Sequence, residues 1–166
     1  MPDQADPDRI ATLIAQLGLK PHPEGGHFAE VYRSAHQVLS PVHEARRAAV
    51  TDIYFLLPGD AYSAFHRVEH DEVWHLYEGA PLEIVEFDDS SGTIRRTTLN
   101  PVGQPPAFKH TVIGGNWQAA RSLGSYTLVG CTVAPGFSFD DFTLMRSDRE
   151  ISDNFRKCFP AFADLI

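Results

Sequence analysis

Residues Tyr62–Gly79, with the sequence YSAFHRVEHDEVWHLYEG, contain two apolar runs on either side of a polar, histidine-rich segment. The runs Tyr62–His66 and Glu72–Tyr77 are short and rich in aromatic and β-branched residues, which predicts two β-strands joined by a turn. His66 ends the first run and Glu72 opens the second, so the two side chains face each other across a hairpin. We therefore expect His66 and Glu72 to point into one cavity.

Runs of the same texture continue on both sides of this hairpin. The breaks between them carry turn-forming residues, as in Pro58-Gly59-Asp60 and Gly114-Gly115-Asn116. No helical pattern separates the runs, so the series predicts an antiparallel sandwich or barrel and not a parallel α/β sheet. Residues 35–47 are polar and lack clear periodicity, which predicts a mobile loop. The other predicted strands are Phe28–Arg33, Ala49–Leu57, Leu82–Phe87, Thr93–Leu99, Phe108–Ile113, Trp117–Arg121 and Tyr126–Val133.

A helix is predicted at each end of the chain. The first covers about residues 7–17, where apolar residues recur every third or fourth position. Asp6 is a suitable cap, Pro7 suits the first helical position, and Gly18 ends the pattern. We expect this helix to pack on the outside of the barrel. A second, shorter helix is predicted over about residues 148–158, where it closes the domain.

Composition indicates one globular domain over residues 1–166, with the barrel spanning about 28–145. The chain is 43% hydrophobic, which excludes wholesale disorder, and its net charge of −8 argues against nucleic-acid binding. No stretch approaches the roughly 18 apolar residues that span a bilayer, and residues 1–6 are polar, unlike a signal peptide. Cys131 and Cys158 are the only cysteines, so neither a zinc ribbon nor a disulfide framework is expected. A cytoplasmic location is therefore the expectation.

The densest chemistry lies in residues 66–75, which hold three imidazoles and three carboxylates. Imidazole nitrogen and carboxylate oxygen suit zinc, iron, manganese, nickel or copper, and histidine also moves protons near neutral pH. The Glu-His-Asp segment at residues 69–71 is typical of a solvated turn, and we expect that role for it. His66 and Glu72 differ because each borders an apolar run, so they are the functional candidates.

The stretch around His66 resembles the first motif of the cupin superfamily. In that motif a Gly precedes two His separated by one residue, then a Glu and a later Gly. The resemblance maps Gly59, His66, Glu72 and Gly79 onto the motif, with the Gly59-to-His66 interval one residue longer than usual. Val68 stands where the second His is expected, which removes one ligand that metal-binding cupins use.

The second cupin motif, Pro-x-Gly-x-x-His, is similar to residues 113–118, Ile-Gly-Gly-Asn-Trp-Gln. Ile replaces the Pro, and Gln118 takes the position of the His. An amide oxygen is a weaker ligand than imidazole for borderline metals. The resemblance therefore implies a metal-ligand set reduced to His66, Glu72 and Gln118, with a divalent metal bound weakly and no obligatory cofactor.

Six segments in chain order resemble one branch of small bacterial and fungal cupins whose activity is unassigned. The resemblance extends from Leu17 to about Met145 and implies an all-β, double-stranded β-helix, the cupin jelly-roll barrel, with a short helix at each end. One fold hosts many chemistries, so this branch does not name a substrate. The six segments are Glu24–Gly26, Tyr32–Ser34, His66–Arg67, Asp71–His75, Trp117–Gln118 and Gly130–Phe137.

Several further residues are candidates for contact with a ligand in the barrel. Arg33 can bind a carboxylate or phosphate bidentately, although a strand-end arginine paired with an acidic neighbour is equally consistent. Trp117 can stack on a substrate ring or fill the core. Trp74 follows Glu72 by two residues and shares its face, which leaves His75 on the other face unless a bulge shifts the phase. The predicted substrate-binding residues are Tyr32, Arg33, Trp74, Trp117 and Gln118.

Two other segments have competing interpretations. Glu24–Gly26 predicts a turn that positions the first strand, and the alternative is that its glutamate or Tyr32 borders the mouth of the pocket. Phe137, Phe139 and Phe142 are expected in the core and not around a ligand.

Together these features favour a small-molecule-binding cupin. In a dry barrel cavity His66 acts as general base, and Glu72 orients it or titrates with it. This resembles deoxysugar epimerases and other sugar-processing cupins, where an inward His abstracts a proton alpha to a carbonyl. The leading hypothesis is therefore an isomerase, epimerase or lyase acting on a carbohydrate-like or small polar substrate. A metal-dependent, dioxygenase-like enzyme and a non-catalytic binding or storage-type barrel are the alternatives.

The fold hypothesis also predicts an assembly and a core. We expect a homodimer, because cupins of this kind pair through sheet edges and an exposed edge strand is an association hazard. Phe28–Arg33 is the expected edge or exchange element. The residues expected to be buried are Leu56, Phe65, Trp74, Leu76, Val129 and Val133.

Overall fold

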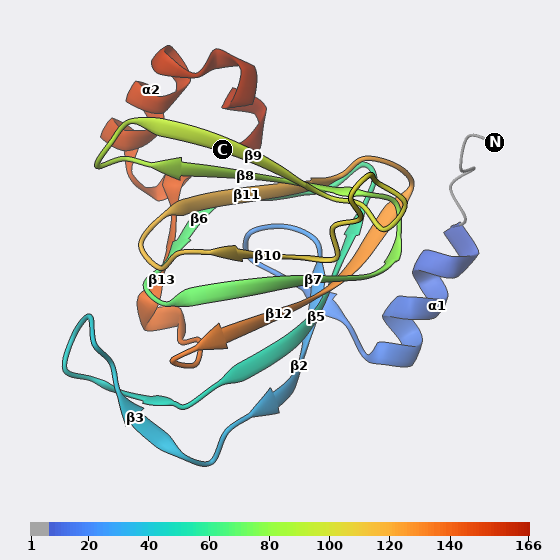
Figure 1. Cartoon of the computed structure of the whole chain (residues 1–166), viewed down its shortest axis with the longest axis horizontal. Coiled ribbons are helices and arrows are strands. Elements are labelled where there is room, and N and C mark those ends of the chain that lie inside the picture. Colours follow the sequence, from blue (N-terminus) through green and yellow to red (C-terminus); the bar gives the residue numbers. More distant parts are fainter. Residues whose placement is uncertain (1–6) are drawn as a thin grey trace.

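The computed structural model describes residues 7–166 as two antiparallel sheets stacked on each other (Figure 1). The proposed cap Asp6 lies outside these residues. The six-stranded sheet has the order β1 (Lys20–Pro21), β2 (His27–Arg33), β5 (Thr51–Pro58), β12 (Tyr126–Ala134), β7 (Asp71–Gly79) and β10 (Lys109–Val112). The five-stranded sheet has the order β13 (Phe142–Leu144), β6 (Tyr62–Val68), β11 (Trp117–Ser122), β8 (Leu82–Asp88) and β9 (Thr93–Leu99). The predicted double-stranded β-helix is confirmed.

Alternation along the strands decides which side chains enter the barrel. In β7, Glu72, Trp74 and Leu76 are buried, while the residues between them are more exposed. The strand is regular here, so His75 lies on the outer face, where its Nε2 is 3.4 Å from Thr132 Oγ1. All six residues expected in the core are buried: Leu56, Phe65, Trp74, Leu76, Val129 and Val133.

The helix α1 (Pro7–Leu17) packs on the outer face of the six-stranded sheet, as predicted. Its buried Leu13 contacts a cluster that includes Leu56 and Leu128. Arg9 holds the helix to β7 through two 2.7 Å bonds to the Glu78 carboxylate. No helix within residues 7–166 is long and apolar enough to cross a membrane.

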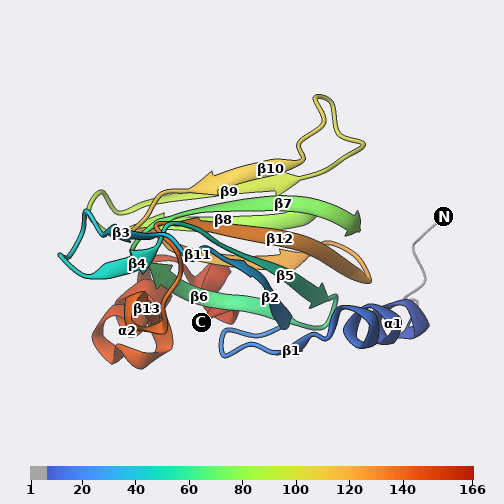
Figure 2. The ribbon, with the colours of Figure 1, turned by 90° about the horizontal axis from the view of Figure 1, so that it is seen from below.

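The helix α2 (Arg149–Cys158) covers the outer face of the five-stranded sheet, and α1 lies at the other end of the molecule (Figure 2). Asp148 caps α2 by accepting a 3.0 Å bond from the Ile151 amide. Phe155 is buried and packs on Phe65 at a ring-centroid distance of 4.8 Å. Three 3₁₀ helices complete the C-terminal region: η1 (Phe139–Asp141), η2 (Met145–Ser147) and η3 (Pro160–Leu165).

The segment expected to be a mobile loop, residues 35–47, carries a two-stranded ribbon instead. Its strands are β3 (Gln37–Leu39) and β4 (Arg46–Ala48), which pair antiparallel and project from the barrel (Figure 2). The sequence pattern misses them because this short ribbon is anchored by polar side chains and not by an apolar face. Arg47 is the main anchor, and its partner lies beside the mouth of the barrel.

Candidate functional site

A cavity of about 340 Å³ lies between the two sheets. Both His66 and Glu72 line it, so the structure brings the two predicted catalytic residues into one space. They do so from opposite sheets, because β6 and β7 do not pair and the predicted hairpin is wrong. Both side chains are buried, as is that of Glu24, which joins them on the cavity wall. Apolar walls surround these polar groups, contributed by Phe28, Ile53, Phe55, Val68 and Val133, with Phe137 and Phe139 near the entrance.

Glu24 reaches the cavity because a tight turn brings it against β6. Gly25 has φ +113°, and a Cβ at this position would lie 2.1 Å from the carbonyl oxygen of Tyr62. Only glycine fits this approach. The Glu24 carbonyl then accepts a 2.8 Å bond from the Ala64 amide, two residues before His66. The segment is thus both a turn and a wall of the pocket, so its two competing interpretations hold together.

The hydrogen bonds define which nitrogen of each histidine carries a proton. His66 Nδ1 is 2.8 Å from the carbonyl oxygen of Ala64, which only accepts, so Nδ1 is protonated. Burial lowers the pKa of His66 and keeps the ring neutral, so Nε2 is unprotonated. The Glu24 amide donates to His22 Nδ1 over 3.3 Å, so that nitrogen is also unprotonated. Glu24 Oε2 lies 3.3 Å from His66 Nε2 and 3.4 Å from His22 Nδ1. Both of these nitrogens present a lone pair to Glu24 Oε2, and a proton on this oxygen can be donated to either of them.

Glu72 is held from behind by a chain of hydrogen bonds. Gln118 Nε2 donates to Glu72 Oε2 over 2.6 Å, and Gln118 Oε1 accepts from Trp74 Nε1 over 2.9 Å. Gln118 and Trp74 are buried and do not line the cavity. The predicted substrate-binding role for these two is therefore replaced by support of Glu72.

Burial dominates the electrostatics of the cavity. It raises the pKa of Glu24 to about 7 and the pKa of Glu72 to about 7, since a carboxylate loses hydration there. Burial also lowers the pKa of His66, and Glu72 opposes this only in part. The thiol of Cys131, which lines the cavity, has its pKa raised well above the usual value, so it stays protonated. The site at neutral pH is therefore a neutral imidazole next to two carboxyl groups that titrate near pH 7.

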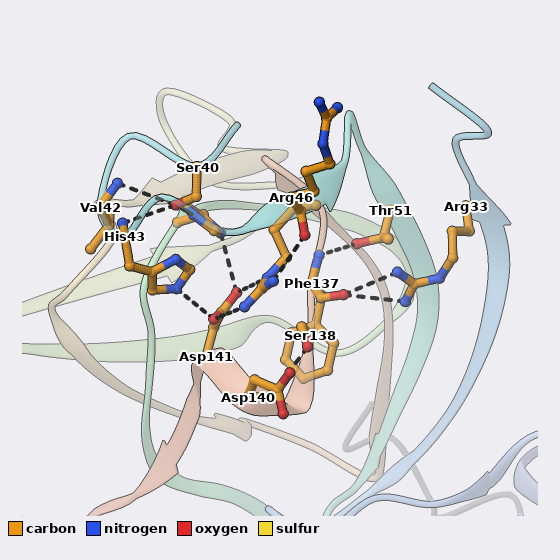
Figure 3. A network of polar contacts seen from close by, with 12 residues as sticks. Arg33, Ser40, Val42, His43, Arg46, Thr51, Phe137, Ser138, Asp140 and Asp141 are labelled. Carbon is orange, nitrogen blue, oxygen red and sulfur yellow. Dashed lines mark hydrogen bonds and ion pairs between the residues drawn. The ribbon is translucent and has the colours of Figure 1, made fainter. Parts of the chain in front are cut away.

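The entrance of the cavity is built from β2 and the segment that follows β12 (Figure 3). Arg33 binds both carboxylate oxygens of Glu30 at 2.9 and 2.7 Å, and it donates to the Phe137 carbonyl at 3.2 Å. The Phe137 amide donates to Thr51 Oγ1 over 2.9 Å. Arg33 therefore borders the cavity as expected, but most of its donors are used to fix the entrance. Phe137 and Phe139 line the cavity, which corrects the expectation that they belong to the core.

Asp141 fastens the β3–β4 ribbon beside this entrance (Figure 3). Its carboxylate accepts bonds from Arg47 at 2.7 and 2.6 Å and from His43 Nε2 at 2.7 Å. His70 lies 3.8 Å from the same carboxylate and bonds to Ser40 Oγ over 2.8 Å. The expectation of a solvated turn is wrong for His70, which is only 3% exposed because the ribbon covers it.

Two more of the predicted substrate-binding residues, Tyr32 and Trp117, lie outside the lining of the cavity. Tyr32 is more than half exposed and pairs with Asp52, whose side chain faces outward to Thr132. A bulge between Glu30 and Tyr32 reverses the alternation of β2, so Arg33 and not Tyr32 faces the cavity. Trp117 is buried under α2 in the outer aromatic cluster, so its alternative role as a core residue applies.

The metal positions implied by the cupin motifs do not fit a bound ion. Val68 lines the cavity without a donor atom, and Gln118 has committed its oxygen to Trp74 and its nitrogen to Glu72. Only His66 and Glu72 keep ligand chemistry at these positions, short of the three or four protein ligands of zinc sites. Across residues 7–166, no group of three His, Cys, Asp or Glu side chains is arranged to hold a metal.

His22 is a polar group of the cavity that the sequence did not single out, whereas Glu24 was an alternative candidate for the mouth of the pocket. His22 lines the cavity and makes edge contacts with Phe28 and Phe142, at centroid distances of 4.6 and 5.8 Å. The signal for Glu24 was present in the Glu-Gly-Gly turn, because two glycines allow a close approach. No local pattern marks His22.

The chain matches the family model described as Cupin superfamily (DUF985) over residues 11–145. A hypothetical protein from Leishmania major is 30% identical, with a TM-score of 0.78 over 94% of this chain and 95% of that one. A protein from Shewanella oneidensis is 29% identical, with a TM-score of 0.78 over 98% and 94%. The oxalate decarboxylase of Lactobacillus farciminis is 14% identical, with a TM-score of 0.58 over 92% of this chain and 43% of that one, and shares the fold. No match was found among the curated proteins.

Proposed function

The chain belongs to the DUF985 family of the cupin superfamily, and we propose that its barrel binds a small molecule and catalyses proton transfer on it. The reaction class is isomerase, epimerase or lyase chemistry, and the substrate is a small polar or carbohydrate-like molecule with a carbonyl group. The observation that carries this proposal is the neutral imidazole of His66, which shares one cavity with two carboxyl groups whose pKa values burial raises to about 7. Groups that titrate near the working pH are the most effective general acids and bases.

The residues divide the chemistry as follows. His66 Nε2, the unprotonated nitrogen, accepts a proton from the carbon alpha to the substrate carbonyl. The carbon–hydrogen electron pair forms the carbon–carbon double bond of an enol, and the carbonyl oxygen takes a proton from the carboxyl group of Glu72. Return of a proton to carbon gives an isomer or epimer, and loss of a β-substituent gives an eliminated product. Glu24, once ionised, stabilises the imidazolium from 3.3 Å.

The cavity restricts which molecules can react. Its volume of about 340 Å³ suits a small metabolite and not a polymer chain. Among the described residues that line it, Arg33 is the only arginine or lysine, and its guanidinium is bound to Glu30. A neutral substrate, or one whose charge stays at the entrance, is therefore favoured over a substrate with a buried anion.

The test is solvent-deuterium wash-in at carbon. The protein is incubated in D₂O with carbonyl-bearing sugars and small hydroxy ketones, and incorporation is followed by proton NMR and mass spectrometry. We expect one or more compounds to exchange, and expect His66→Gln and Glu72→Gln to slow exchange by at least about 100-fold. His75→Gln is the matched control, since His75 lies on the outer face of the strand that carries Glu72.

Two results would overturn the catalytic proposal. Exchange that persists in His66→Gln would place the chemistry elsewhere. A panel in which no compound exchanges, while compounds still raise the melting temperature of the wild type and not of His66→Gln, would make the barrel a binding protein.

A further inference from the structure

The buried pair His22 and Glu24 separates two hollows. One is the barrel cavity, and the other is a depression of about 300 Å³ on the outside of the molecule. Both residues line both hollows. The outer depression is completed by Pro23, Gly25, Ala61, Tyr62 and Arg146.

The wall between the hollows is rigidly built. Arg146 donates a 2.8 Å bond to the Pro23 carbonyl, next to Glu24 in the chain. Ser63 Oγ donates to Glu24 Oε1 over 2.8 Å, which leaves Oε2 as the oxygen between the two imidazoles. The side chain of Glu24 is therefore fixed with one oxygen facing His66 on one side and His22 on the other.

The acid–base reaction of His66 requires the proton on Glu24 Oε2 to move away. The proton on Glu24 Oε2 faces the lone pair of His66 Nε2, the atom that must accept the substrate proton. That proton has to leave before His66 can act as a base. The acceptor on the other side of Oε2 is His22 Nδ1, at 3.4 Å.

We propose that His22 and Glu24 form a proton relay that connects His66 to water in the outer depression. The proposal rests on the acid–base function of His66. Glu24 Oε2 gives its proton to His22 Nδ1, and His22 releases its Nε2 proton to water. His66 Nε2 then accepts the substrate proton and pairs with the Glu24 carboxylate. The net change is one proton moved from substrate carbon to His66 and one lost from Glu24 to water, with His22 left protonated on Nδ1 in place of Nε2. The reverse sequence resets the site.

His22 acts through Glu24 in this relay and touches no reacting atom, so it is not a catalytic residue. Its ring sits among aromatic side chains, with centroids 4.6 Å from Phe28 and 5.9 Å from Phe55. His22→Phe therefore keeps the shape of the ring and removes both nitrogens. His27→Phe is the matched control, because His27 is close in the chain and lines neither hollow.

The first measurement needs no substrate. Nitrogen-15 NMR of histidine-labelled protein reports which ring nitrogen is protonated as the pH changes. We expect His66 protonated on Nδ1 and His22 on Nε2, and expect both rings to respond to one shared transition, that of Glu24. Glu24→Gln should remove the shared transition from both rings, and His27→Phe should leave it in place. Independent titration of the two rings, or a shared transition that survives in Glu24→Gln, overturns the relay.

The second measurement uses any compound that exchanges deuterium with the wild type. His22→Phe should slow exchange roughly 10-fold in dilute buffer, and added imidazole should restore it by delivering protons through the outer depression. Exchange at the wild-type rate, or a loss that imidazole does not restore, contradicts the relay and leaves the function of His66 intact. Absence of exchange in the wild type contradicts the function, and the NMR titration still decides the connection between the rings.

Discussion

Glu24 in the barrel and Asp141 beside its entrance are both buried acids, yet their pKa values move in opposite directions. Burial raises the pKa of Glu24 to about 7. Hydrogen bonds from Arg47 and then His43 lower the pKa of Asp141, against the opposing effect of its burial. The difference lies in the partners, since Asp141 meets a guanidinium and Glu24 meets a hydroxyl group and two neutral imidazoles.

This difference separates a structural acid from a reactive one. A buried carboxylate is stable when cations and hydrogen bonds replace its hydration, and such an acid holds elements together. A buried carboxyl group without a cation is costly to ionise, because its charge loses hydration in an apolar environment. It therefore lowers the stability of the fold at pH values above its ordinary pKa, where the unfolded chain ionises freely. The barrel retains two such groups, Glu24 and Glu72, around one histidine, as a proton-transfer site requires.

The largest expected effect is a gain of stability in Glu24→Gln at about pH 8. In the unfolded chain Glu24 ionises near pH 4.5, whereas in the folded protein it keeps its proton to about pH 7. The free energy of unfolding of the wild type therefore decreases by about 3 kcal/mol as the pH rises from the lower to the higher of these two pKa values. Gln cannot ionise and still donates to His66, so the variant avoids this loss.

Urea unfolding at several pH values measures the difference directly. The two proteins should have similar stability near pH 4 and should diverge as the pH rises through 7. A Glu24→Gln variant that is less stable than the wild type at pH 8 would show that Glu24 is compensated, as Asp141 is.

Asp141→Asn should have the opposite sign. Loss of the carboxylate leaves Arg47 without its bidentate partner, so the ribbon loosens and the melting temperature falls by roughly 5 °C near neutral pH. The folded pKa of Asp141 is lowered, so its contribution is present above its ordinary pKa and is lost as the pH falls below it. Calorimetry at neutral and acidic pH checks both statements. Asp140→Asn is the matched control, because Asp140 is exposed and acts on Arg47 of the ribbon through its charge alone, and a loss of equal size there would contradict the clamp.

Local sequence patterns predicted most of the strands and, in the site, the pair His66 and Glu72 but not His22. Period-two alternation placed Glu72, Trp74 and Leu76 on one face. The strand-end positions of His66 and Glu72 predicted their shared cavity, although their strands lie in opposite sheets and not in the expected hairpin. The bulge in β2 was not visible in the sequence, and it exchanges the faces of its last residues, which is why Tyr32 was assigned wrongly.

The remaining errors concern contacts between segments far apart in the chain. The ribbon that covers His70 has no apolar periodicity, so its docking to Asp141 leaves no local signal. His22 is brought beside His66, 44 positions later, by the turn that follows it, and no spacing rule links the two. Such contacts depend on how the sheets stack and not on any one strand.

A smaller effect is expected for Gln118→Met, which tests how the barrel site is held. The amide of Gln118 donates to Glu72 and lowers its pKa, so its removal should raise the pKa of Glu72 further. Trp74 Nε1 also loses its buried acceptor, which costs about 1 kcal/mol of stability. Carbon-13 NMR of the glutamate carboxyl groups reports the titration. A pKa of Glu72 that is unchanged or lower in the variant would mean that Gln118 is only a packing residue.

The smallest expected effect belongs to His43→Gln, which removes one partner of Asp141 and leaves Arg47 in place. A hydrogen bond to its own backbone and the carboxylate of Asp141 raise the pKa of His43. Its charged form therefore stabilises the fold below the ordinary histidine pKa, and this contribution disappears as the pH rises through the raised value. Because His43 is more than a third exposed, solvent screens the pair, and the melting temperature should fall by only about 1 °C near pH 5.5 and by less near pH 8. His36→Gln, at an exposed histidine at the base of the same ribbon, is the control and should leave the melting temperature unchanged. A loss as large as that of Asp141→Asn would mean that His43, and not Arg47, is the main partner of Asp141. The entrance of the barrel would then respond to pH in the range where histidine titrates.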